Sequence, residues 1–203
     1  MFIKIYPDNP NPRDLKIVTE ELEKGGIIIF PTDTVYGIGC DIYQPKAVNK
    51  IVRIKGVDPS KPNFSFICYD LSHLSDFTRH VDNSVFKLMK KNLPGPFTFI
   101  LHSSNKVPKL FERKKKTVGI RIPDNNIARE IVKELGHPIM TTSVHDEDEV
   151  IEYTTDPELI NEKYKGIVDI IIDGGYGNNE ASTVVDCTGD EPEITRQGIG
   201  ILE

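Results

Sequence analysis

The sequence predicts a single α/β domain built on a twisted, mostly mixed β-sheet. Apolar runs of strand length, such as Ile27 to Phe30, alternate along the 203 residues with stretches whose apolar residues recur at helical spacing. The alternation does not follow a regular strand-helix-strand repeat, which disfavours a purely parallel sheet. No repeat, low-complexity segment or linker divides the chain, so we expect residues 1–203 to form one domain.

Composition excludes several classes of protein. With 38% hydrophobic and 28% charged residues the chain can bury a core, so disorder is not expected. Lys and Arg (25) against Asp and Glu (31) give a net charge of 25 − 31 = −6. An acidic chain is not expected to bind nucleic acid over its whole surface, but a local basic cleft stays possible.

Cysteine usage and hydropathy predict a cytoplasmic protein. The three cysteines are far apart and form no CxxC pair, which argues against a disulfide framework and for a reducing compartment. The longest apolar runs fall well short of the roughly 20 residues that span a bilayer. The first residues lack the basic and apolar segments of a signal peptide.

In the first half of the chain, helices are predicted where Asn or Pro precedes apolar residues at helical spacing. The first begins at Asn11-Pro12 and ends at Gly25-Gly26, and the second begins at Pro45 and ends near Lys55-Gly56. The third covers 83–92 and ends before the Pro94-Gly95-Pro96 turn. The strands predicted here are 27–30, 64–69 and 97–101, with a loop enforced by Pro59 and Pro62.

The second half continues the alternation. Asp124 is predicted to cap a helix that Gly136 ends, and a short helix is predicted over 157–163. The predicted strands are 117–122, 139–143, 168–172, 183–186 and 193–196.

Common catalytic and cofactor motifs are missing. Gly37-Ile38-Gly39 begins like a dinucleotide fingerprint, but Ile42 occupies the third glycine position. There is no Walker A sequence and no GxSxG elbow, and the five histidines show no HExxH pattern, so we expect no protein-bound metal. The basic run 113–116 and the acidic run 146–149 are most simply solvated turns, with a phosphate or RNA contact as the alternative for the basic one.

Seven short polar stretches lie at predicted strand ends, where α/β proteins commonly hold ligands. Each also has a simpler structural reading as a turn, a helix end or a strand start. Arg121 is the least easily explained in that way, because a lone arginine on a buried strand is costly unless paired or bound to an anion. The stretches are 31–39, 53–56 with Lys61 beyond, 93–98, 119–123, 173–175, 181–186 and 195–198.

The order of these stretches resembles the YrdC-like family over roughly residues 15 to 200. The similarity is carried by PTDTVYGIG at 31–39, LPGPFT at 93–98, VGIRIP at 118–123, STVVD at 182–186 and TRQG at 195–198, with TTS at 141–143 and DGG at 173–175. The best-known members of the family are threonylcarbamoyl-AMP synthases.

This resemblance implies a twisted sheet around a large, open, positively lined cavity, as in YrdC/RibB-like folds. It implies a nucleotidyltransferase reaction that joins L-threonine, bicarbonate and ATP, with Mg²⁺, into threonylcarbamoyl-AMP for the modification of tRNA adenosine. Carried over by position, Lys55 and Arg121 are the catalytic candidates facing the phosphates. The substrate-binding candidates are Thr32, Thr34, Tyr36, Arg53, Lys61, Ser143, Ser182, Thr183 and Arg196.

Two departures from the synthase pattern bring the chain closer to the YciO branch of the family. Synthases usually carry Lys-Gly-Arg-Pro where this chain has Lys55-Gly56-Val57-Asp58, and Arg53 is the candidate replacement for the arginine. Synthases also usually carry Ser-x-Asn where this chain has Ser143-Val144-His145. Two further functions therefore stay open: an RNA- or nucleotide-binding paralogue with weak or no synthase activity, whose RNA would be tRNA or double-stranded RNA, and an accessory acting on another carbamoyl-adenylate.

Overall fold

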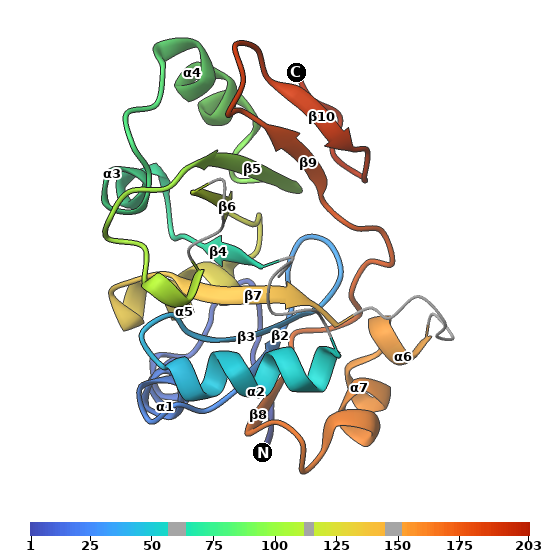
Figure 1. The fold of residues 1–203 in the computed structure, drawn as a ribbon. Helices are drawn as coiled ribbons and strands as arrows, with labels where there is room; N and C mark the ends of the chain where they lie inside the picture. Colours follow the sequence, from blue (N-terminus) through green and yellow to red (C-terminus); the bar gives the residue numbers. More distant parts are fainter. Residues whose placement is uncertain (57–63, 112–115, 145–151) are drawn as a thin grey trace.

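Ten strands of the protein form one sheet in the computed structural model, which describes residues 1–56, 64–111, 116–144 and 152–203 (Figure 1). The order across the sheet is β1-β8-β2-β3-β7-β4-β6-β5-β9-β10. The strands are Phe2–Lys4 (β1), Ile28–Phe30 (β2), Gly37–Asp41 (β3), Ser65–Ile67 (β4), Phe97–His102 (β5), Thr117–Arg121 (β6), Ile139–Ser143 (β7), Ile170–Asp173 (β8), Thr183–Asp186 (β9) and Glu193–Arg196 (β10).

The sheet is mixed, as predicted. The pairs β1–β8, β2–β8, β4–β6 and β5–β9 are parallel, and the pairs β2–β3, β3–β7, β4–β7, β5–β6 and β9–β10 are antiparallel. Strands that are distant in sequence are neighbours, since β8 lies between β1 and β2, and β7 lies between β3 and β4. Polar stretches from both halves of the chain therefore reach the same part of the sheet.

Helices cover both faces of the sheet because each carries an apolar stripe. One core joins α1 and α5 to β2 and β8 through residues such as Leu22, Phe30 and Ile131. The other joins α2, α4 and α7 to the opposite side through Ile51, Met89 and Ile160. The helices are Pro12–Glu23 (α1), Pro45–Lys55 (α2), Leu74–Phe77 (α3), Asn83–Asn92 (α4), Asn126–Leu135 (α5), Glu152–Thr155 (α6) and Pro157–Tyr164 (α7), with 3₁₀ turns at Leu71–His73 and Lys109–Phe111.

The helix ends follow the predicted signals with one correction. The Asn11 side chain caps α1 by accepting from the backbone N–H of Arg13, and Gly136 ends α5 in the left-handed conformation at φ +80°. The prediction that Asp124 caps α5 was wrong. The capping side chain is that of Asn125, which accepts from the backbone N–H of Ala128, whereas Asp124 lies one residue earlier.

Two strands were not predicted. The short β1 lies at the edge of the sheet, and β3 occupies 37–41, within a stretch read as a ligand-binding turn. A side chain at Gly39 would lie 2.5 Å from the backbone oxygen of Met140, so glycine allows β3 to lie close against β7. The other strands lie within two residues of their predicted bounds, whereas the proline-rich loop at 57–63 and the basic and acidic runs fall largely or wholly outside the described residues.

No helix in the described part of the chain is both long and apolar enough to cross a membrane.

Candidate functional site

One face of the central strands carries small and polar side chains. Residues directly opposite one another in a sheet share a face, and the register pairs Ser143 with Gly37, Thr141 with Ser65, and Ser65 with Gly119. The alternate residues on these strands, such as Met140, Phe66 and Ile120, belong to the apolar core of the other face. We call the polar face the polar floor: Gly37, Gly39, Ser65, Thr98, Gly119, Arg121, Thr141, Ser143, Ser182 and Arg196.

Arg121 ends β6 on this floor and is held by the loop between β2 and β3. Its Nη2 donates to Asp33 Oδ1 at 3.1 Å and to Thr34 Oγ1 at 2.9 Å. The arginine is 8% exposed, and its buried Nε has no hydrogen-bond partner among the described residues. A guanidinium with an unused buried donor can bind an anion at little further cost of desolvation.

The hydroxyls of the same loop form an ordered chain. Thr32 Oγ1 donates its proton to the carbonyl oxygen of Val35 at 2.8 Å, so it acts as the acceptor in its 3.2 Å bond with Thr34 Oγ1. Thr34 therefore donates to Thr32 while it accepts from Arg121. Both hydroxyls are buried, and their directions are fixed by the arginine and the loop backbone.

Arg196 ends β10 and lies against the start of β9. Its Nη2 donates to the Ser182 carbonyl oxygen at 2.8 Å and to Ser182 Oγ at 3.2 Å, and Ser182 Oγ lies 2.8 Å from Thr98 Oγ1 on β5. The acceptors that hold Arg196 are thus uncharged, and its positive charge is not compensated by them.

The two arginines are close enough to interact electrostatically. Burial lowers the pKa of Arg121, the Asp33 carboxylate opposes this, and the charge of Arg196 lowers that pKa further. Burial also lowers the pKa of Arg196. Both guanidinium groups remain protonated at neutral pH. Asp33 pairs with Arg121, and the nearby Asp124 carboxylate acts on Asp33. Among the described residues no carboxylate pairs with Arg196, so this part of the polar floor can attract an anion.

Tyr36 lies beneath the site rather than in an open pocket. It is fully buried, its hydroxyl donates to the Gly175 carbonyl oxygen at 2.6 Å, and it accepts from the Gly174 N–H at 3.2 Å. Burial raises the pKa of Tyr36, so the phenol keeps its proton. The predicted Asp173-Gly174-Gly175 stretch is therefore fixed against the predicted Thr32–Tyr36 stretch.

Thr183 is also fully buried, and its hydroxyl holds the C-terminal segment. Thr183 Oγ1 donates to the Gly200 carbonyl oxygen at 2.6 Å and accepts from the Gly198 N–H at 3.0 Å. It thereby fixes the backbone that directly follows Arg196.

Lys55 and Ser143 meet at the end of β7. Lys55 Nζ, at the end of α2, donates to the carbonyl oxygen of Val144 at 3.2 Å, and Ser143 pairs with Gly37 across the strands. Val144 is joined to the loop before β3, because its N–H donates to the Tyr36 carbonyl oxygen at 2.9 Å.

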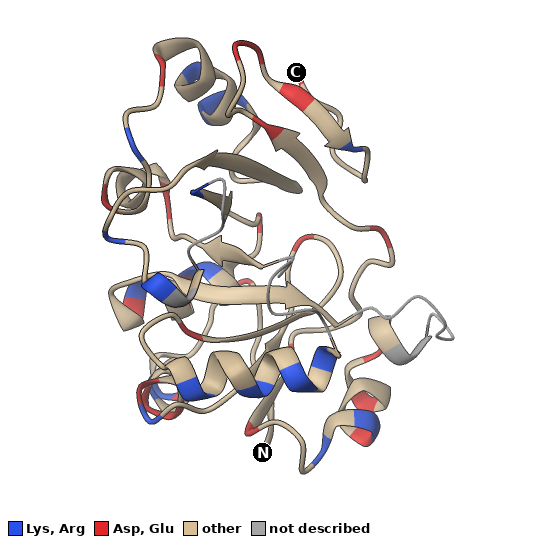
Figure 2. Ribbon diagram, in the orientation of Figure 1, with Lys and Arg blue, Asp and Glu red and all other residues tan. Residues whose placement is uncertain are grey.

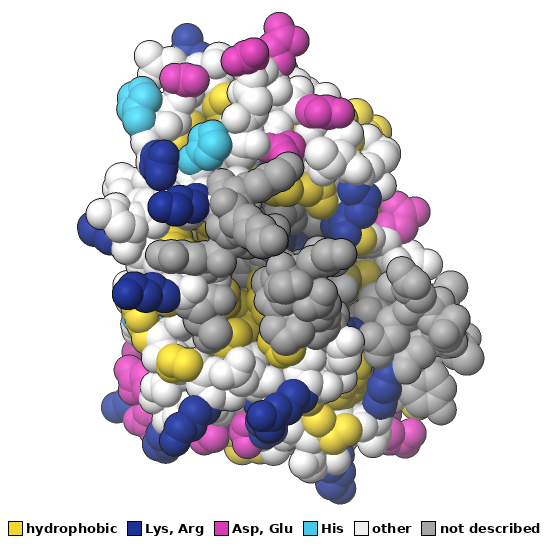
Figure 3. Space-filling view, viewed as in Figure 1, with side chains coloured by type: hydrophobic (Ala, Val, Ile, Leu, Met, Phe, Trp, Pro, Cys, Tyr) yellow, Lys and Arg dark blue, Asp and Glu magenta, His cyan; other side chains and the backbone are white. Residues whose placement is uncertain are grey.

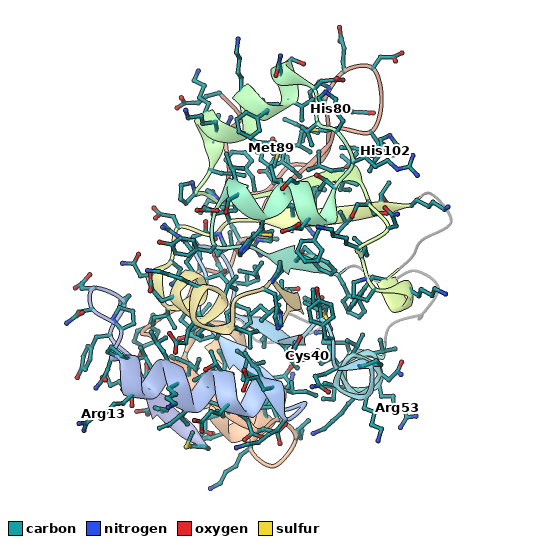
Figure 4. The ribbon with its side chains drawn as sticks, turned by 90° about the vertical axis from the view of Figure 1, so that its left-hand side faces the viewer. Arg13, Cys40, Arg53, His80, Met89 and His102 are labelled. Carbon is teal, nitrogen blue, oxygen red and sulfur yellow. The ribbon has the colours of Figure 1, made fainter. Side chains whose placement is uncertain are left out.

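The structure separates Arg53 from these side chains. Arg53 is exposed, and Figure 4 shows it extending from α2 away from the sheet. It lies two residues before Lys55, which is more than half a helical turn, so the two side chains leave the helix in different directions. Basic residues recur along the exposed side of α2 (Figures 2 and 3). Lys61 lies outside the described residues.

An open pocket of about 570 Å³ adjoins the loop that holds Arg121. Thr32 and Asp33 form one wall, and the connection from β8 to β9 forms another. Asn178 joins the two walls, because its backbone N–H donates to the Thr34 carbonyl oxygen at 3.1 Å. The remaining lining residues are Thr155, Tyr176, Gly177, Asn178 and Asn179.

Sequence reasoning did not identify Asp33, Thr98 and Asn178 as site residues. Asp33 and Thr98 lie inside stretches that were singled out, PTDTVYGIG and LPGPFT, so their position in the sequence was a usable signal. Their contacts with Arg121 and Ser182 depend on the order of the strands. Asn178 had no such signal.

Comparisons with known proteins agree with this fold. A family model for Sua5, YciO and YrdC proteins, described as "Telomere recombination", matches residues 20–198. YciO of Escherichia coli K12 is 42% identical over 201 residues, 98% of this chain and 96% of YciO. The crystal structure of E. coli YciO matches with a TM-score of 0.92 at 40% identity, covering 100% of this chain and 98% of that one.

More distant similarity extends to proteins with a named activity or ligand. The threonylcarbamoyl-AMP synthase of Bacillus subtilis is 32% identical over 179 residues, 87% of this chain and 51% of the synthase. The structure of Pyrococcus abyssi Sua5 complexed with L-threonine matches with a TM-score of 0.87 at 26% identity, covering 98% of this chain and 57% of that one. With the family model spanning most of its length and a YciO protein aligned almost end to end, this chain belongs to the Sua5/YciO/YrdC family.

Proposed function

We propose that this protein forms threonylcarbamoyl-AMP from L-threonine, bicarbonate and ATP, for the modification of tRNA adenosine. The observation that carries the proposal is the pair of arginines on the polar floor: Arg121 is held by Asp33 and Thr34, and Arg196 is held by uncharged oxygens of Ser182. Positive groups fixed in a site of small side chains suit a triphosphate. The similarity to the B. subtilis synthase and to a Sua5 structure holding L-threonine supports the choice of reaction.

The reaction has two steps that need no covalent protein intermediate. The amine of threonine attacks the carbon of bicarbonate, and loss of water leaves a carbamate. A carbamate oxygen then forms a bond to the α-phosphorus of ATP, and the bond from that phosphorus to the bridging oxygen breaks to release pyrophosphate. Negative charge grows on the phosphoryl oxygens as this occurs, and fixed cations stabilise it.

The described residues suggest a role for each side of the site. Arg121 and Arg196 would hold the phosphates, and Lys55 would approach from the end of β7. The pocket beside Thr32 would hold the amino acid. No group of three or more His, Cys, Asp or Glu side chains in the described residues fits a metal ion, so Mg²⁺ would arrive on the phosphates of ATP.

Compartment and redox state are consistent with this reaction. Cys40, Cys68 and Cys187 are free thiols, and burial raises the pKa of each. We therefore place the reaction in a reducing compartment, the cytoplasm.

The first test is an assay for the adenylate product. Purified protein with ATP, Mg²⁺, labelled bicarbonate and L-threonine is expected to yield labelled threonylcarbamoyl-AMP and an equal amount of pyrophosphate. Lys55→Ala is expected to lower kcat on the order of 10²-fold, if the ammonium stabilises developing charge. Lys46→Ala, on the exposed side of the same helix, is the matched control. Absence of product at high protein concentration would contradict the proposal.

A second function, nucleotide or RNA binding with weak or no synthesis, is favoured by one observation. The chain has Val57 where synthases usually carry an arginine, and Arg53, the candidate replacement, extends away from the sheet. Calorimetry with ATP and with tRNA separates the two functions. Tight binding of either ligand without release of pyrophosphate supports the second function.

A further inference from the structure

Asp33 is a buried carboxylate that joins three elements around the site. Its side chain is 9% exposed, and both oxygens are occupied. Oδ1 accepts from Arg121 Nη2 at 3.1 Å, and Oδ2 accepts from the backbone N–H of Asp124 at 2.9 Å. Asp33 thus connects the loop before β3 to the end of β6 and to the residues that lead into α5.

These contacts fix the orientation of the arginine. Arg121 Nη2 is held between Asp33 Oδ1 and Thr34 Oγ1, two residues of one loop. Because the guanidinium is planar and rigid, fixing one nitrogen on two acceptors also fixes the direction of Nε, which lacks a described partner. Among the described residues, neither Nε nor Nη1 of Arg121 has a partner, so Asp33 and Thr34 aim both of these donors.

Asp33 also sets the charge of the site. Arg196 is held by uncharged oxygens of Ser182, and its charge acts on Arg121. Without the carboxylate, Arg121 would lose the negative charge that offsets its repulsion by Arg196, and its side chain could move. Burial raises the pKa of Asp33 while Arg121 opposes that rise, which agrees with a carboxylate held in place by its arginine.

We infer that Asp33 is a positioning residue, which aims the Arg121 guanidinium at the phosphates and offsets its repulsion by Arg196. The inference rests on the proposed function, in which Arg121 binds the phosphates of ATP. Asp33 itself touches no reacting atom and acts through the arginine. The alternative is that Asp33 and Arg121 form a buried ion pair with a structural role alone.

The test compares Asp33→Asn with Asp124→Asn. Both variants remove one negative charge from the same neighbourhood, but Asp124 is exposed, and the described hydrogen bonds and ion pair of Arg121 go to Asp33 and Thr34. The amide introduced by Asp33→Asn can accept from one of the two donors that the carboxylate serves, and it presents an N–H to the other. Because one of the two hydrogen bonds of the carboxylate is lost, the Arg121 guanidinium is no longer held in its orientation, and kcat is expected to fall about 10- to 100-fold.

The expected pattern separates positioning from folding. For Asp33→Asn we expect little change in the KM for ATP and a steeper dependence of the ATP dissociation constant on NaCl, because the site has gained positive charge. Asp124→Asn is expected to stay within about 2-fold of the parent protein, both in the KM for ATP and in the NaCl dependence of the ATP dissociation constant. Asp33→Glu retains the charge, so it should keep the parent salt dependence even if the longer side chain lowers kcat.

A double-mutant cycle with Arg121→Lys tests whether Asp33 acts through the arginine. If it does, Asp33→Asn costs much less kcat in the Arg121→Lys background than in the parent. Equal costs in both backgrounds, or an Asp33→Asn variant that behaves like Asp124→Asn, would overturn the inference while leaving the proposed function intact.

If the parent protein binds ATP without turnover, the salt dependence alone decides the inference. If it neither binds ATP nor forms product, both proposals are wrong.

Discussion

The hydroxyl of Tyr36 joins two stretches of chain that are nearly 140 positions apart, Tyr36 itself and Gly174-Gly175. Tyr36→Phe removes both of these part-buried hydrogen bonds, so the Gly175 carbonyl oxygen and the Gly174 N–H lose this partner. We expect the free energy of unfolding to fall by about 1–3 kcal/mol, measured by urea denaturation. Tyr6→Phe removes an exposed hydroxyl and should change stability by less than about 0.5 kcal/mol.

Tyr36→Phe also tests how the free energy of unfolding depends on pH. Burial raises the pKa of Tyr36 above its ordinary value of 10.0. The unfolded chain therefore releases this proton near pH 10 while the folded chain keeps it, so the stabilising contribution is present below pH 10 and is lost as pH rises. The parent protein should lose more stability between pH 9 and 11 than Tyr36→Phe does. Cys40 and Cys68 titrate alike in both proteins, so an identical loss would contradict the shift.

How far single residues could be predicted depends on what their role requires. Arg121 was predictable because an arginine between aliphatic residues on a strand needs an anionic partner. Asp33 was not, since a carboxylate in a turn is common and only the strand order reveals that it meets Arg121. Arg53 was predicted as a site residue from its nearness to Lys55 in sequence, but its side chain leaves α2 in a different direction.

At the scale of elements, the segment that follows Arg196 is held against the start of β9. Thr183 Oγ1 holds Gly198 and Gly200, and Gly198 is packed so closely that an added side chain would lie 2.2 Å from the Ala181 carbonyl oxygen. Arg196 in turn donates a hydrogen bond to the carbonyl oxygen of Ser182, the residue before Thr183. The hydroxyl of Thr183 and the guanidinium of Arg196 therefore fasten β9 to the C-terminal segment from two sides.

Thr183→Val tests this arrangement with almost no change in side-chain shape. Loss of the buried hydroxyl is expected to lower the free energy of unfolding by about 1–3 kcal/mol. It should also weaken ATP binding several-fold, because the backbone beside Arg196 is freed. Thr195→Val, at an exposed position on β10, is the matched control. A Thr183→Val variant that is destabilised but binds ATP like the parent would show that the segment does not position Arg196.

Elements with a strong local signal were predictable, and elements defined by their neighbours were not. The helix α4 matches its predicted bounds, 83–92, since its apolar spacing and the prolines that follow are local features. The strand β3 contains Gly37 and Gly39 and lacks the apolar alternation of a strand, so its sequence resembles a turn. It forms because β2 and β7 supply partners on both sides.

For the whole molecule, the sequence predicts the class of fold but not the neighbours within the sheet. The N-terminal strand β1 pairs with β8, and β9, near the C-terminus, pairs with β5, so both ends of the chain belong to the same sheet. The two termini nevertheless lie at opposite ends of the molecule (Figure 1). Nothing local in these strands specifies those pairings. The resemblance to a known family predicted a twisted sheet around a cavity, and it likewise gave no strand order.

Because the site draws on β6, β10 and the loop before β3, a ligand held there should stabilise the whole fold. ATP at 100 times its dissociation constant is expected to add about 2.7 kcal/mol to the free energy of unfolding, which calorimetry detects as a rise in Tm. The rise should shrink with added NaCl, since Arg196 is exposed and its attraction for the phosphates is screened by salt. Arg196→Gln should abolish most of it, while Arg79→Gln, an exposed arginine away from the polar floor, should not. An equal rise in both variants would mean that ATP binds elsewhere, and the convergence of these elements on one anion site would be wrong.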